Sequence, residues 1–106
     1  MNAPRIAVLG AGPAGCAVAL GLQRLGYRVW VISEWRRFAA VEGVSARVLE
    51  GLRQVGLHQA LASAAPPTPR RVSWSGVDQL LNDERLLDRR LFDAALRRDL
   101  ADAGVE

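Results

Sequence analysis

The first third of the chain alternates short apolar runs with one glycine-rich turn and one amphipathic stretch. Ile6 to Leu9 form a continuous apolar run, which predicts a buried strand, and the β-branched and aromatic residues between Arg28 and Ile32 predict a second, parallel strand. Between them, apolar residues recur with helical spacing at Ala17, Val18, Leu20, Leu22 and Leu25, before Gly26 ends the helix. Residues 4–34 are therefore predicted to be a strand–helix–strand unit of an α/β fold with a parallel sheet.

The remainder of the chain predicts two helical parts around a proline-rich break. A helix is expected from Glu42 to Val55, capped by Ser45 if it begins there, and a short continuation completes a helical segment over 42–64. Three prolines make 65–70 a linker, and 71–106 is predicted to hold a strand around Val72 and Trp74, a turn or short partner strand over 77–83, and a helix. That last helix, over about 90–103, is expected to bury the stripe Leu91, Ala94, Ala95, Leu96, Leu100 and Ala103.

The turn between the first strand and the first helix carries the spacing G-x-G-x-x-G. Gly10 permits the tight turn, Gly12 removes a side chain that would block a pyrophosphate, and Gly15 lets the helix lie close to the sheet. Pro13 suits the first helical turn, and the backbone around Pro13 and Ala14 directs the positive end of the helix toward an anion. The pattern predicts a dinucleotide site.

An acidic residue completes this motif. Glu34 directly follows the second strand, about 20 residues after the last glycine of the motif, where a carboxylate accepts hydrogen bonds from ribose hydroxyls. A carboxylate repels a 2′-phosphate, so NADP is disfavoured as the first ligand. The motif alone leaves FAD and NAD open, because both contain an ADP half.

Composition narrows the classes of function. The 106 residues suit one domain, and all 14 basic residues are arginines that alternate with acids, which favours a solvated surface over a nucleic-acid partner. Cys16 and His58 are each the only residue of their type, so neither a disulfide nor a metal site is expected, and a cytoplasmic location fits the single cysteine. Cys16 is expected to be a small packed side chain. No apolar run has the length of a membrane helix, so no membrane partner is expected.

The residues beyond Glu34 favour FAD, because a plain NAD domain would continue with a crossover helix and a third parallel strand. The stretches GAGPAGCAVAL and VISE, the helix VSARVLEGLRQVGL and the segment ERLLDRRLFDAALRRDLADAGV resemble the FAD domain of flavoproteins related to p-hydroxybenzoate hydroxylase, geranylgeranyl reductase and the flavin-dependent tryptophan halogenases. The resemblance covers essentially the whole chain. It implies an FAD-binding, Rossmann-like domain in an oxidoreductase of monooxygenase, reductase or halogenase type.

The resemblance also implies roles for particular residues. Arg89, with Phe92 and Asp93, matches a family motif at the head of a helix, which implies that Arg89 lies near the ribityl and pyrophosphate part of the flavin. Arg47, near the start of its helix, is implied to approach the pyrophosphate or the ring. Apart from the resemblance, Trp35 is a candidate for the edge of the cofactor groove, with core or surface packing as the alternative. The predicted cofactor-binding residues are Gly10, Gly12, Pro13, Ala14, Gly15, Glu34, Trp35, Arg47 and Arg89.

Members of that family are several hundred residues long, so residues 1–106 are expected to be the N-terminal part of the FAD-binding domain, with the substrate domain absent. No catalytic residue is identified, the expected substrate is a small molecule of unknown identity, and this part alone is expected to be inactive; NAD(P)H is compatible as a co-substrate of the larger protein. Two alternatives stay open: an NAD(P)-binding module, or a truncated remnant that acts at most as an interaction domain. Uncovered sheet edges would favour a homo-oligomer.

Overall fold

The computed structural model describes residues 4–35 and 40–106, without the side chains of 68–72, 74 and 77–83. Strands β1 (Arg5–Leu9) and β2 (Arg28–Ile32) pair in parallel, in a register that joins Arg5 to Arg28 and Leu9 to Ile32. Helix α1 (Pro13–Arg24) connects them, and Gly26 takes a φ of 98° just beyond its end. The predicted strand–helix–strand unit and the α/β class with a parallel sheet are confirmed.

The segment after β2 differs from the prediction at its start. Glu42 to Val44 do not begin a helix but belong to strand β3 (Val41–Val44), which pairs antiparallel with β5 from Val41↔Asp88 to Val44↔Arg85. Helix α2 (Ala46–Val55) begins after Ser45, whose hydroxyl accepts a hydrogen bond from the Val48 N–H at 3.4 Å, and Gly56 ends it with a φ of 88°. The capping role of Ser45 is thus confirmed, and α3 (His58–Ala62) is the short continuation.

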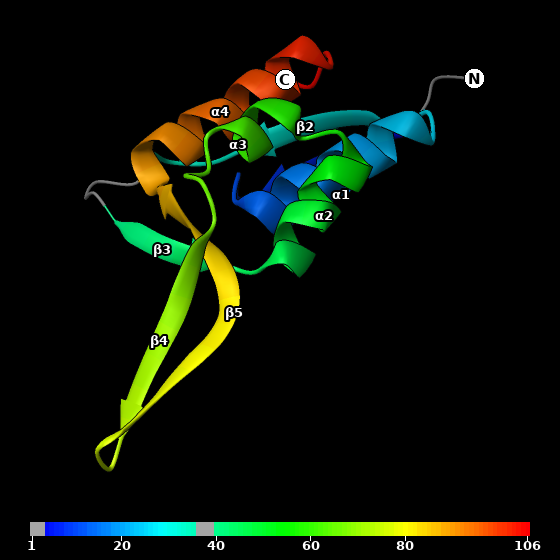
Figure 1. Cartoon of the computed structure of the whole chain (residues 1–106). Helices are drawn as coiled ribbons and strands as arrows, with labels where there is room; N and C mark the ends of the chain where they lie inside the picture. Colours follow the sequence, from blue (N-terminus) through cyan, green and yellow to red (C-terminus); the bar gives the residue numbers. More distant parts are fainter. Residues whose placement is uncertain (1–3, 36–39) are drawn as a thin grey trace.

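A long hairpin comes next in the chain. Strands β4 (Thr68–Trp74) and β5 (Val77–Asp88) are antiparallel and complete a three-stranded sheet of order β3-β5-β4. Strand β4 begins inside the predicted linker 65–70, and the partner strand continues well beyond the predicted 77–83 because it pairs with both β3 and β4. Ser75 and Gly76 form the turn with φ values of 50° and 77°, as a tight hairpin requires. The hairpin extends away from the helices (Figure 1), and the molecule measures 65 × 28 × 22 Å.

Helix α4 (Arg89–Asp102) packs against α1 and α3, and its buried face differs from the predicted stripe. Leu91 is 60% exposed and Ala103 is exposed as well, whereas Phe92 is buried, together with Ala95, Leu96 and Leu100. Asp99 also lies on this buried face, where its carboxylate accepts hydrogen bonds from the N–H groups of Gln59 at 3.0 Å and Ala60 at 2.9 Å. The buried stripe therefore begins one residue later than predicted and includes an acid, because Asp99 caps the first turn of α3 from outside that helix.

The core lies between the helices and one face of the parallel pair. It is formed by Cys16, Ala19, Leu20, Val29, Leu49, Leu52, Leu57, Ala60, Ala64, Leu87, Phe92, Ala95, Leu96, Leu100 and Val105. The alternate side chains Leu9, Trp30 and Ile32 are exposed on the opposite face of β1 and β2. Among the helices in the described ranges, none combines the length and apolar character needed to cross a membrane.

Candidate functional site

The reason for having glycine differs among the three glycines of the motif. Gly10 has a φ of 104°, and its N–H donates to the Ile32 carbonyl at 2.8 Å, which holds the turn against the end of β2. At Gly15 a Cβ would lie 2.1 Å from the Gly10 carbonyl oxygen, so helix α1 approaches the turn too closely for any side chain. These two glycines are required by the fold itself.

Gly12 has no such requirement. Its backbone is extended, with φ −75° and ψ 178°, which any residue adopts, and a Cβ built there would meet no atom within 4 Å. Neither conformation nor packing within the described chain explains the missing side chain. The open space at Gly12 is therefore available to a ligand, as the motif predicted for a pyrophosphate.

Helix α1 begins at this open space. Pro13 is its first residue, and no described side chain caps it or places an acid in its first turn. The amide groups of a first turn lack intrahelical acceptors, and the helix dipole adds positive potential there. The N-terminus of α1 thus offers donors to an anion.

A cleft of about 320 Å³ lies above the glycine turn. Three segments line it: the β1–α1 turn, the residues after β2 and one face of α4. The lining residues are Gly10, Ala11, Gly12, Ser33, Glu34, Trp35, Arg89, Asp93 and Arg97. The structure thus brings together five of the nine predicted residues: Gly10, Gly12, Glu34, Trp35 and Arg89. Pro13, Ala14 and Gly15 belong to the first turn of α1 outside this lining, and Arg47 lies exposed on α2.

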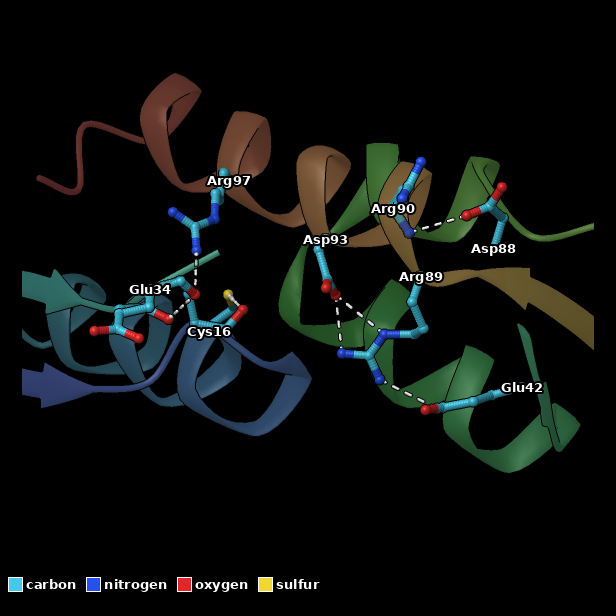
Figure 2. A network of polar contacts seen from close by, with 10 residues as sticks. Cys16, Glu34, Glu42, Asp88, Arg89, Arg90, Asp93 and Arg97 are labelled. Atoms are coloured by element: carbon cyan, nitrogen blue, oxygen red, sulfur yellow. Dashed lines mark hydrogen bonds and ion pairs between the residues drawn. The ribbon is translucent and has the colours of Figure 1, made fainter. Parts of the chain in front are cut away.

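Arg89, one of the lining residues, lies between two carboxylates. Its Nε and Nη2 donate to Asp93 Oδ1 at 3.1 and 2.9 Å, and its Nη1 donates to Glu42 Oε2 at 3.1 Å (Figure 2). Burial opposes the charge on Arg89, but the hydrogen bonds and charges of Asp93 and Glu42 outweigh it and raise its pKa. Arg89 is therefore a fixed cation, and its guanidinium lies 5.5 Å from the Phe92 ring centroid.

Arg97 contributes a second cation that the sequence interpretation missed. Its Nη2 donates to the Glu34 carbonyl at 3.0 Å, and its guanidinium carbon lies 3.6 Å from the Trp35 ring centroid. Its Nε is buried without a hydrogen-bond partner among the described residues. Helical spacing was the available signal, because Asp93 and Arg97 follow Arg89 at intervals of four residues and so share its face of α4.

The thiol of Cys16 lies close to this polar group but takes no part in it. The side chain is buried and its Sγ donates to the Ala11 carbonyl at 3.4 Å. Burial raises the pKa of the thiol to about 11, and the nearby Arg97 charge lowers it only in part. The thiol is therefore protonated and unreactive at neutral pH, which confirms the prediction of a packed side chain.

The sequence model of the FAD binding domain family matches residues 4–95. The chain belongs to this family. The family model is that of an FAD binding domain, so the cofactor is FAD and not NAD, the other dinucleotide that the glycine motif left open. An FAD binding domain fits the site's own chemistry: an unoccluded glycine, a helix N-terminus and two arginines surround one cleft, with an acid at its edge.

Solved structures extend this result. The chain is 67% identical to a structure described as "Peptidyl tryptophan dihydroxylase QhpG essential for tryptophylquinone cofactor biogenesis", with a TM-score of 0.88, over 98% of this chain and 24% of that one. The tetrameric form of 2-methyl-3-hydroxypyridine-5-carboxylic acid oxygenase matches with 23% identity and a TM-score of 0.77, over 100% of this chain and 31% of that one. This second likeness concerns the fold. The comparison with curated proteins found no match.

This FAD binding domain thus spans about a quarter to a third of the length of these structures. The similar structures are described as a dihydroxylase and an oxygenase, and the family model is that of an FAD binding domain, so the resemblance to FAD-dependent oxidoreductases is confirmed. An NAD(P)-binding module and a remnant without a ligand gain no support from these findings.

Proposed function

We propose that this FAD binding domain serves a monooxygenase that hydroxylates tryptophan side chains within a peptide. The observation that carries the proposal is the 67% identity to peptidyl tryptophan dihydroxylase QhpG over 98% of the chain. A match of this extent takes in the three segments that line the cleft: the glycine turn, the end of β2 and helix α4. A peptide thus replaces the unknown small molecule as the proposed substrate.

Within the cleft, each segment has a proposed partner on FAD. The Glu34 carboxylate accepts hydrogen bonds from the adenosine ribose, and the space at Gly12 with the N-terminus of α1 receives the pyrophosphate. Arg89 and Arg97 supply positive charge along the same wall, and Trp35 borders it. Arg47 is not proposed as a ligand on this geometry, because it does not line the cleft.

The bound flavin supplies the redox and oxygen chemistry. In a monooxygenase reaction one atom of O2 enters a C–H bond of the substrate as a hydroxyl group. The other atom leaves as water, with two electrons and a proton supplied by NAD(P)H plus one further proton from solvent. NAD(P)H is therefore the proposed co-substrate of the complete protein. The cytoplasmic location and the homo-oligomer through sheet edges stay predictions.

A chimera tests whether this domain can serve tryptophan hydroxylation. The matching segment of QhpG is replaced by this chain, and the hybrid is incubated with a tryptophan-containing peptide, FAD and NAD(P)H. Peptide mass spectrometry is expected to show the addition of oxygen at tryptophan, and no addition with a Gly12→Val hybrid. A hybrid that folds and retains flavin absorbance but leaves the peptide unchanged would contradict the proposed role in tryptophan hydroxylation and would not affect the assignment of FAD as cofactor.

A further inference from the structure

Arg89 is the cleft residue whose charge is most fully compensated. It forms ion pairs with Glu42 and Asp93, so one guanidinium is shared between two carboxylates (Figure 2). Its side chain is only 11% exposed. A cation in this state attracts a further anion weakly, although it lines the cleft proposed for the FAD diphosphate.

The two carboxylates are held unequally. Asp93 lies one turn further along α4, is 14% exposed and accepts both the Nε and Nη2 hydrogen bonds of Arg89. Glu42 comes from β3, is 45% exposed and accepts one hydrogen bond, from Nη1. Asp93 is therefore the permanent partner, and Glu42 is the contact that an incoming anion can exchange.

We infer that Glu42 limits the affinity of the site for the FAD diphosphate by competing with it for Arg89. This inference rests on the proposed placement of the diphosphate in the cleft. Arg89 lines the cleft and Glu42 is not among the lining residues, so Glu42 contacts Arg89 from outside the lining of the ligand space. A bound diphosphate either displaces the Glu42 carboxylate or remains near its negative charge, and both reduce the net attraction.

The test compares three forms of the chain by isothermal titration with FAD, ADP and adenosine. Glu42→Gln removes the charge but keeps a side-chain oxygen for Arg89. Glu50→Gln is the matched control, because Glu50 is an exposed carboxylate that pairs with Arg53 on α2 and its loss changes the net charge equally. Glu50 is not among the residues that line the cleft, and distant exposed charges are screened by salt.

Glu42→Gln is expected to increase the affinity for FAD and ADP by about two- to fivefold, which corresponds to the free energy of an exposed ion pair. The affinity for adenosine is expected to stay unchanged, because adenosine has no phosphate. Glu50→Gln is expected to change none of the three. Equal behaviour of the two variants, or weaker FAD binding by Glu42→Gln in a folded protein, would overturn the inference.

A second variant guards against misfolding of the first. Glu42→Asp keeps the charge but withdraws it from Arg89 by one methylene group, so it is expected to tighten FAD and ADP by less than Glu42→Gln. If FAD and ADP bind to none of the forms, both the proposed placement of the diphosphate in the cleft and this inference are wrong. If the wild type binds FAD and neither Glu42 variant has a higher affinity for FAD, only the inference about Glu42 is wrong.

Discussion

Replacing Gly15 by alanine is expected to destabilise the fold, because the helix α1 approaches the glycine turn at this residue. The added Cβ would lie 2.1 Å from the Gly10 carbonyl oxygen and 3.2 Å from its carbonyl carbon. Both are backbone atoms, and the Gly10 N–H is bonded to β2 through Ile32. The overlap therefore cannot be relieved by rotating a side chain.

The magnitude depends on two opposed terms. Overpacking at a closely packed position costs about 1–3 kcal/mol, and a clash between backbone atoms belongs in the upper part of that range. Alanine in place of glycine in a helix offsets this by about 1 kcal/mol. The net loss is therefore about 1–2 kcal/mol, which lowers the Tm of a domain of this size by about 4–16 °C.

Urea denaturation followed by circular dichroism measures this loss. Gly21→Ala is the matched control, because it is the same substitution in the same helix and its Cβ meets no atom within 4 Å. The control is expected to be more stable than wild type by about 0.5–1 kcal/mol. Gly15→Ala with a stability equal to that control would refute the close approach of α1 to the turn.

Two further predictions concern buried groups. Asp99→Ala is expected to lower the free energy of unfolding by about 1–3 kcal/mol in the same denaturation assay, because the N–H groups of Gln59 and Ala60 lose their acceptor. The control Asp102→Ala removes a surface contact with Gln59 and is expected to change the free energy of unfolding by less than about 0.5 kcal/mol. Equal losses would argue against the cap. Cys16 is expected to resist alkylation at pH 8 until urea unfolds the chain. Folding raises the pKa of its thiol from 9.0 to about 11. The stability that the neutral thiol contributes is therefore present below pH 9 and declines as the pH rises toward 11. Rapid alkylation of the native protein, or no loss of stability in that pH range relative to Cys16→Ala, would contradict the buried, neutral thiol.

The local sequence pattern was sufficient to predict the parts of the fold that are formed by residues close together in the chain. The strand, turn, helix and second strand between Arg5 and Ile32 follow from short-range periodicity and glycine positions. Strand β3 did not follow, because its partner β5 lies more than 40 residues further along and its pairing overrides the helical pattern of Glu42 to Val44. The length of β5 escaped prediction for the same reason.

The residues of the candidate site likewise fall into those marked by a local sequence motif and those placed by tertiary packing. The glycine motif and Glu34 carry a local signature, and the structure places Gly10, Gly12 and Glu34 around one cleft. Arg97 shares a helix face with Arg89 and Asp93 by its spacing, but its position at the cleft depends on the packing of α4 against the end of β2. Asp99 was unpredictable for a related reason: its buried position depends on the amides of another helix.

Binding of FAD to the wild-type chain and to Gly12→Val tests the central claim most directly. Gly12 has ordinary extended geometry and open space around it, so valine is expected to leave the unfolding transition within about 1 kcal/mol of wild type. Its side chain would occupy the space proposed for the pyrophosphate. The predicted result by isothermal titration is FAD binding by wild type and by Gly21→Ala, and its loss in folded Gly12→Val. Undiminished FAD binding by Gly12→Val, or none by the folded wild-type chain, would contradict the claim that this cleft is the FAD site.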